Sequence, residues 1–243
     1  MERLPARASK RRSARIVGRI EPHRVRTFRR ALLVWARRDG RRFFWREPGL
    51  TPFAALVTEI LLTKTRAALV DIVARRVLER YPTITKLADA SAADLETLLF
   101  PLGLHRKRAA SLTACAQAVR DRHGGVVPPT LSELLELPAI GRYAANAIAC
   151  VVYDRQVAVL DANVSRIYQR VFSLPRPPDR LAAAHDLWRI AEQMIPDGRA
   201  KEYNWAILDL GGTICTAKAP RCPKCPIFGH CDRYGVVQSP SEP

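Results

Sequence analysis

Two carboxylates, Glu59 and Asp161, are candidates for a role in binding or catalysis because of the residues around them. Glu59 interrupts the apolar segment 53–61, and a carboxylate among apolar side chains is costly unless it has a partner or a task. Asp161 follows the apolar run 157–160 and precedes a segment with helical spacing. Each has a simpler interpretation as well, because Glu59 can face water and Asp161 can merely cap a helix.

The segment before Asp161 has the pattern of a helix-hairpin-helix. Leucines end one apolar helical face at 134–137, residues 138–141 form a Pro-x-x-Gly turn, and apolar residues then recur at helical spacing through Val151. The free backbone N–H groups at the start of the second helix attract phosphate, so Gly141 and Arg142 are predicted to contact DNA. A phosphate site followed by one carboxylate is typical of an enzyme acting on DNA, although such a turn is often only a turn.

Two further segments are weaker candidates for DNA contact. The interruption at 100–104 is followed by a basic helix start at 105–108, which repeats the loop-to-helix pattern and makes Gly103 and Arg106 candidates. Thr63 and Lys64 are polar residues where the helix containing Glu59 is expected to end, and they are predicted to lie at the surface.

Four of the six cysteines fall within 17 residues near the end of the sequence, as Cys215, Cys222, Cys225 and Cys231. Four clustered thiolates suit either zinc or a [4Fe–4S] cluster, and spacing alone does not choose between them. Cys115 and Cys150 lie on apolar helical faces and are expected in the core.

The composition indicates a polyanionic partner. The formal net charge is +17 and the pI is near 10.4, which favours nucleic acid over a membrane surface. No run approaches the ~18 uncharged apolar residues of a membrane helix, so we expect a soluble intracellular protein. Residues 1–20 are arginine-rich with little apolar periodicity and are interpreted as a disordered basic arm, which either contacts backbone phosphate or is a solvated tail.

Helical periodicity recurs along the rest of the sequence and no persistent period-2 pattern occurs, so the fold is predicted to be all-α. Helices are expected near 28–36, from Pro52, over 67–81 and 84–99, from His105, from Leu131, over 161–172 and 181–194, and over 203–210. Ser91 and Asp94 resemble a capping box, and Gly211-Gly212 is expected to stop the last helix.

The cysteine spacing, following the hairpin and Asp161, resembles the helix-hairpin-helix DNA glycosylases of the endonuclease III superfamily over residues 24–235. The resemblance implies a [4Fe–4S] cluster on the four cysteines and two helical domains with a DNA-binding cleft between them. We assign 50–157 to a helical domain with the hairpin, 21–49 plus 158–235 to an iron–sulfur domain, and 236–243 to a tail. Residues 138–143 match the family's Leu-Pro-Gly-Val-Gly hairpin, with Ala139 in place of its first glycine.

Tyr143 indicates the branch of the superfamily. The endonuclease III branch has a lysine here that attacks the sugar, whereas a tyrosine forms no Schiff base. The protein is therefore expected to remove a base without cutting the strand. The segments LVTEILLTKT, GRYAANAIACVVY and VLDANVSRI are most similar to thymine/uracil mismatch glycosylases. The alternatives are an adenine or oxidised-base mismatch glycosylase and a non-catalytic DNA-binding protein with the same scaffold. The C-terminal domain usual in the adenine enzymes is not expected after Pro243.

The resemblance also implies roles for the candidate residues. Asp161 would stabilise the positive charge that grows on the sugar, and Glu59 would line the base pocket, protonating the leaving base or positioning water. Tyr143 would pack against the sugar, while Thr63 and Lys64 would fill the gap left by the flipped nucleotide. The expected partner is double-stranded DNA with a mispaired or damaged base, bound by a monomer in the cytoplasm near the nucleoid.

Overall fold

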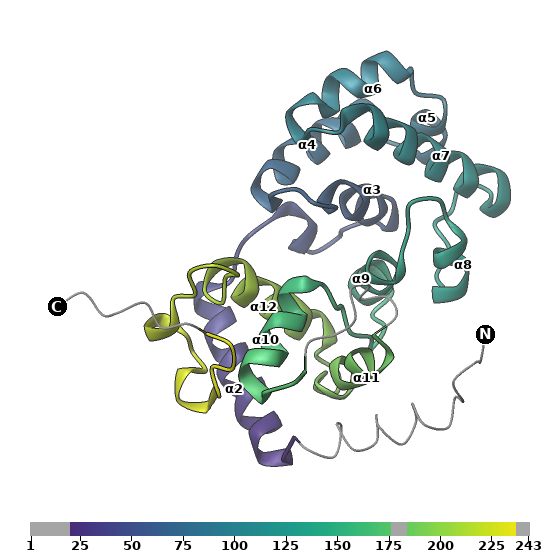
Figure 1. Ribbon diagram of the computed structural model, residues 1–243. Helices are drawn as coiled ribbons and strands as arrows, with labels where there is room; N and C mark the ends of the chain where they lie inside the picture. The colour runs from purple at the N-terminus through teal and green to yellow at the C-terminus, as the bar shows by residue number, and fades with distance from the viewer. Residues whose placement is uncertain (1–19, 176–183, 237–243) are drawn as a thin grey trace, which may run out of the picture. The chain divides into compact units, whose positions relative to one another are not determined.

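The computed structural model describes residues 20–175 and 184–236, and within them all regular secondary structure is helical (Figure 1). The prediction of an all-α fold is confirmed for this part of the chain. The predicted basic arm, apart from Ile20, lies outside it, as do residues 237–243 and the first residues of the helix expected over 181–194. No helix in the described residues combines the length and apolar character needed to cross a membrane.

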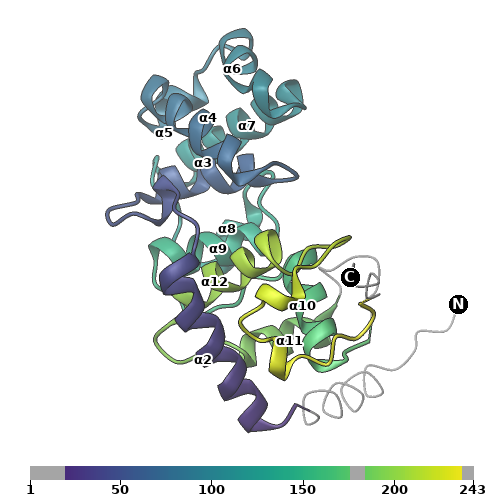
Figure 2. The ribbon, with the colours of Figure 1, turned by 90° about the vertical axis from the view of Figure 1, so that its left-hand side faces the viewer.

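The chain forms two compact units, one of residues 1–41 and 156–243 and the other of residues 42–155. In the second unit the helices are α3 Pro52–Leu62, α4 Ala67–Arg80, α5 Ile84–Ala88, α6 Ala92–Leu99, α7 His105–His123, α8 Leu131–Glu136 and α9 Arg142–Val152, with 3-10 turns η1 Phe44–Arg46 and η2 Phe100–Leu102. The central element is α3, which packs against α4, α7 and α9 (Figure 2). Thr51 caps its start by accepting a hydrogen bond from the Ala54 amide.

In the first unit the helices are α2 Pro22–Asp39, α10 Ala162–Phe172, α11 His185–Gln193 and α12 Ala200–Thr213, followed by 3-10 turns η4 Cys222–Lys224 and η5 Phe228–His230. Helices α2, α10 and α12 meet around a buried aromatic cluster. Phe28 of α2 lies with its ring centroid 6.4 Å from both Tyr168 of α10 and Tyr203 of α12. The two tyrosine hydroxyls are 3.1 Å apart, so each buried polar group has a partner.

The structure corrects two details of the predicted helices. The helix expected over 84–99 is two helices, because Ser91 caps α6 and accepts a hydrogen bond from the Asp94 amide. Gly211 and Gly212 do not stop α12, which continues to Thr213. A Cβ atom on Gly211 would lie 2.7 Å from Cβ of Asn163, so this glycine serves the close approach of α12 to α10.

Replacing Gly211 with Ala should therefore destabilise the protein. Overpacking a core contact costs roughly 1–3 kcal/mol, and the higher helix propensity of alanine returns up to ~1 kcal/mol. We expect a net loss of about 1–2 kcal/mol in the free energy of unfolding, measured by urea denaturation. Gly229→Ala is the control, because no atom lies within 4 Å of the Cβ it would add. Equal stability of the two variants would contradict the close-packing role.

Candidate active site and four-cysteine loop

Glu59 is a carboxyl with one oxygen sealed from solvent. The residues on either side of it on α3, Thr58 and Ile60, are buried, and Oε2 of Glu59 is itself buried with no hydrogen-bond partner among the described residues. Burial raises the pKa of Glu59 to about 8, because the charged form loses its hydration. The carboxyl is therefore protonated at neutral pH and can donate a proton, whereas a glutamate simply facing water cannot hold one there.

Two elements that pack on α3 bring further side chains toward this part of the unit. Helix α9 carries Tyr143 in its first turn, and η1 carries the aromatic and basic segment that ends the linker from α2. In that segment Phe43 stacks on Trp45 with ring centroids 4.5 Å apart, and the Arg46 guanidinium lies 5.3 Å from the Phe43 ring. The helix with Glu59 is thus in contact with η1, whose Trp45 is buried, within its own unit.

The predicted hairpin is present as α8, a turn and α9. Gly141 is the N-cap residue of α9 and caps it with no side-chain hydrogen bond, while Arg142 is the first helical residue. Ala139, which stands where the family has glycine, adopts φ +65° in the left-handed region. The turn therefore keeps a conformation that suits glycine, at a cost of roughly 1–2 kcal/mol for an L-residue.

The segment with Thr63 and Lys64 lies beside the segment with Gly103 and Arg106, and Arg108 connects the two. This side chain is 6% exposed and donates hydrogen bonds to backbone carbonyls of both segments and to a threonine hydroxyl, at Gly103 (2.9 Å), Leu61 (3.0 Å), Thr63 (3.0 Å) and Thr65 Oγ1. Burial lowers the pKa of Arg108, so these carbonyls stabilise a desolvated cation. Through it the structure brings Thr63 and Lys64 together with Gly103 and the first turn of α7, where Arg106 pairs with Glu96 at 3.6 Å.

Sequence reasoning missed Arg108 and its neighbour Leu104. Arg108 binds backbone carbonyls from a segment more than forty residues earlier, which leaves no mark in the residue pattern. Leu104 is 63% exposed and has φ +49°, like Lys64 at φ +55° on the adjoining segment. An apolar residue directly after Gly103 in a basic segment was the one signal available for it.

Asp161 belongs to the first unit, whereas Glu59 and Tyr143 belong to the second. It is the N-cap residue of α10, as its simpler interpretation predicted, and accepts hydrogen bonds from the Val164 amide at 2.8 Å and from Nδ2 of Asn163 at 2.7 Å. Arg166 in turn donates to Oδ1 of Asn163 and to the carbonyls of Gly211 and Cys215. A continuous series of hydrogen bonds thus connects Asp161 to the first cysteine of the loop.

The four clustered cysteines line one pocket. Cys215, Cys222, Cys225 and Cys231 line it together with Arg170, Ile214 and Ile227, and part of it is open to solvent. None of the four forms a disulfide. Among the described residues no three His, Cys, Asp or Glu side chains converge as ligands of one metal ion. Cys115 and Cys150 are buried, as expected of core residues.

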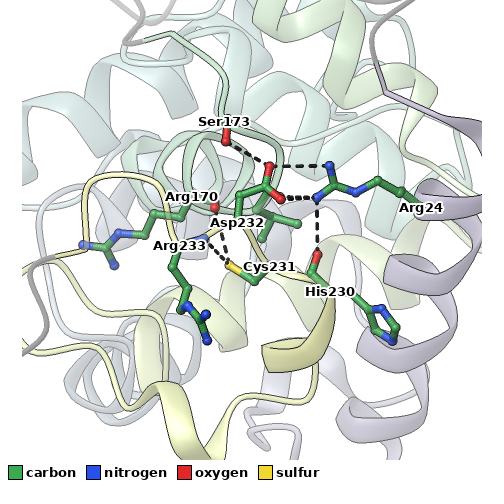
Figure 3. Close-up of polar contacts among 8 residues, drawn as sticks. Arg24, Arg170, Ser173, His230, Cys231, Asp232 and Arg233 are labelled. Carbon is green, nitrogen blue, oxygen red and sulfur yellow. Dashed lines mark hydrogen bonds and ion pairs between the residues drawn. The ribbon is translucent and has the colours of Figure 1, made fainter.

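A polar clasp holds the end of this loop against α2 and α10 (Figure 3). Nη2 of Arg24 donates to Oδ1 of Asp232 and to the carbonyl of Val171, each at 2.8 Å. Ser173, just past α10, donates to Oδ2 of Asp232 at 2.9 Å. Because Asp232 follows Cys231 directly, the clasp fixes the backbone beside the last cysteine.

Comparisons with known proteins agree on one family. Residues 57–193 match the family described as HhH-GPD superfamily base excision DNA repair protein. The thymine/uracil-DNA glycosylase of Pyrobaculum aerophilum is 34% identical over 203 residues, covering 82% of this chain and 88% of the relative. The adenine DNA glycosylase of Mycolicibacterium smegmatis is 36% identical over 200 residues, covering 82% and 67%. The solved structure of a thermostable thymine-DNA glycosylase superposes with a TM-score of 0.81 and 28% identity, over 87% of this chain and 97% of that one.

The buried carboxyl of Glu59 should make stability depend on pH. The native state keeps this proton up to a pKa of about 8, whereas a free glutamate releases it near 4.5. Stability should therefore fall as pH rises between these values, by at most ~1.4 kcal/mol per pH unit, and level off above. Glu59→Gln should remove this part of the slope in urea denaturation across the same pH range. Exposed Glu79→Gln is the control, and parallel curves for wild type and Glu59→Gln would contradict the burial argument.

Proposed function

The chain belongs to the HhH-GPD superfamily of base excision DNA repair proteins and is a DNA N-glycosylase, and we propose that it removes thymine or uracil mispaired with guanine without cutting the strand. The observation that carries the proposal is the buried Oε2 of Glu59, which has no hydrogen-bond partner among the described residues, and burial raises the pKa of this carboxyl to about 8. Its helix α3 contacts the aromatic segment of η1 and helix α9, which carries Tyr143.

On the base side, the target nucleotide first leaves the stack, which costs less for a mispair than for a matched pair. Glu59 then donates its proton to the departing base, or orients it by hydrogen bonding through Oε2. A general acid works best with a pKa near the operating pH, and its value of about 8 meets that condition.

On the sugar side, Asp161 stabilises the positive charge that develops as the glycosidic bond breaks, as carboxylates do at other glycosidic centres. The hydrogen bonds from Val164 and Asn163 keep it oriented and favour its charged form. Tyr143 packs against the sugar and, lacking an amine, forms no Schiff base, so the product is an abasic site in an intact strand.

DNA is held by three loop-to-helix segments. The N–H groups of α9 after Gly141, together with Arg142, bind backbone phosphate. The two segments joined by Arg108 present Thr63, Lys64 and Arg106 to the duplex, and Gly103 lets the backbone turn there. Thr63 and Lys64 fill the gap left by the flipped nucleotide, and exposed Leu104 on the adjoining segment suits insertion between neighbouring bases, because apolar side chains serve as wedges in distorted duplexes. The partner we propose is a double-stranded DNA with a mispair, bound by one copy of the protein.

The four-cysteine loop fits a [4Fe–4S] cluster held by Cys215, Cys222, Cys225 and Cys231. All four cysteines line one pocket, as the ligands of a four-iron cluster must. Nη1 of Arg170 lies 3.4 Å from Sγ of Cys215, and the Arg233 amide lies 3.4 Å from Sγ of Cys231, so donors for thiolate charge are in place. When bound, the cluster cross-links the loop, and base removal needs no redox step.

Asp161→Asn should abolish base excision while DNA binding persists, because the neutral amide keeps the size of the carboxylate but not its charge. The measurement is single-turnover excision on duplexes with G·T, G·U, adenine opposite oxidised guanine, and damaged pyrimidines, each with and without alkali to reveal abasic sites. We expect activity of the wild type on G·T and G·U, with breaks appearing only after alkali.

The duplex panel also separates the rival function. Preference for adenine opposite oxidised guanine would identify an adenine glycosylase, which the similarity to the Mycolicibacterium smegmatis relative also permits. Unchanged turnover by Asp161→Asn would remove this residue from the mechanism. Asp197→Asn, an exposed aspartate of the same unit, controls for loss of one negative charge.

Cys222→Ser should purify with less iron and without the visible absorbance of an iron–sulfur cluster. Asp232→Asn should assemble the cluster but lose it faster in a chelator, because the clasp with Arg24 and Ser173 weakens. Iron content and the rate of absorbance loss are the measurements, with Asp197→Asn as the matched control. Zinc in a colourless wild-type protein would refute the cluster, and equal loss rates in the two aspartate variants would refute the clasp.

A further inference from the structure

The outer face of α2 carries three arginines in a row. Arg26, Arg30 and Arg37 point within about 40° of one direction, since each residue turns an α-helix by about 100°. All three are exposed, and none makes an ion pair or hydrogen bond with another residue in 20–175 or 184–236. Arg37 lies eleven positions after Arg26, a separation of about 16 Å along the helix axis.

The other arginines on the sides of α2 have structural partners. Arg24 belongs to the clasp on Asp232, and Arg29 donates to the last carbonyls around the end of α11, at Gln193, Met194 and Ile195. The face opposite the row is apolar, with Phe28, Leu32 and Trp35 buried, and Leu33, which lies along one edge of the row, is buried as well. The three outer arginines are thus the cations of this helix that its own unit does not use.

We propose that Arg26, Arg30 and Arg37 form a second nucleic-acid surface, which holds the phosphate backbone of a duplex without reading its sequence. Guanidinium groups pair with phosphate in a bidentate fork. A duplex presents one phosphate charge per ~1.7 Å of axis when both strands are counted, so each of the three arginines can pair with a phosphate along the length of the row. The sequence before α2 adds charge of the same sign, with seven Lys or Arg and one acid in residues 1–19.

A protein partner fits this face less well. The buried centre of a protein interface is usually apolar and aromatic, whereas Val34 is the one exposed apolar residue along the row. The face also has no acidic residue between Glu21 and Asp39. A surface of cations with little apolar area suits a polyanion that stays hydrated.

This surface is separate from the position of Asp161 within the same unit. The apolar side of α2 packs on α10 and α12 through Phe28, and Asp161 stands at the start of α10. At about 100° per residue the row lies on the opposite side of α2 from Phe28, and in Figure 2 α2 crosses the front of its unit with no other labelled helix of that unit over it. The row therefore binds a duplex segment other than the one from which the base is removed. This distinction rests on the proposed function, in which base removal takes place at Asp161.

The test is a bridging experiment with the full-length protein. One undamaged duplex is fixed on beads, a second labelled duplex is added, and its retention is measured over a range of salt concentrations. The wild type should retain the second duplex. Arg26→Ala/Arg30→Ala/Arg37→Ala should lose the retention and lower the salt slope of duplex binding by up to about 2.7, three phosphates at ~0.9 each. Single-turnover excision at saturating enzyme should be unchanged.

The matched control removes the same charge from exposed positions of the other unit, as Arg76→Ala/Lys86→Ala/Arg122→Ala. Bridging by this control at the wild-type level supports the surface, and an equal loss would assign the effect to net charge. Wild-type protein that retains no second duplex, or a row variant that bridges normally, overturns the proposal. Retention of labelled polyglutamate through the same arginines, with duplex bridging unaffected, would overturn the assignment to DNA. Wild-type protein that bridges two duplexes through the row but excises no base would count against the proposed function and not against this surface.

Discussion

The hydrogen bonds of the Arg166 guanidinium connect helices α10 and α12 of the first unit, and the positions of Asp161 and the cysteine loop depend on them. The guanidinium donates to the carbonyls of Gly211 and Cys215 at the end of α12 and to Asn163 near the start of α10. Burial lowers the pKa of Arg166, because the cation loses its hydration. The three oxygens replace that hydration and stabilise the charged form. Losing one of them would leave a desolvated charge poorly paired, which is costly. The orientation of Asp161 and the start of the cysteine loop are therefore set together.

Arg108 does the same for the second unit. Each of these arginines sits within a helix and binds carbonyls where another helix has ended, so it supplies the donors that the helix end lacks. In a chain with 40 Lys and Arg residues, the cations that shape the site are thus among the least exposed. The exposed ones remain available for phosphate, as the row on α2 illustrates. Net charge alone does not distinguish these two uses.

The residues whose roles depend on local pattern were accessible from the sequence. The start of α3 at Pro52, the hairpin before Asp161 and the cap at Ser91 follow from spacing and capping over a few positions. Gly211 was misinterpreted because a glycine that ends a helix and one that admits a neighbouring helix have the same sequence appearance. The roles of Arg108, Arg166 and Arg24 depend on carbonyls or carboxylates far away in sequence, and those contacts exist only in the folded chain. Which base the site accepts depends on pocket shape, which spacing does not encode.

Ala139 shows that the hairpin geometry is imposed by its surroundings. An alanine at φ +65° is disfavoured on its own. The turn nevertheless adopts it because Leu137 and Ile140 are buried on either side, and the Ile140 amide bonds the Leu137 carbonyl at 3.2 Å. A glycine there would reach the same conformation without the steric cost, so the alanine subtracts stability and leaves the backbone path unchanged. The start of α9 at Gly141, where phosphate is proposed to bind, is therefore set by buried neighbours of the turn and not by the residue at 139.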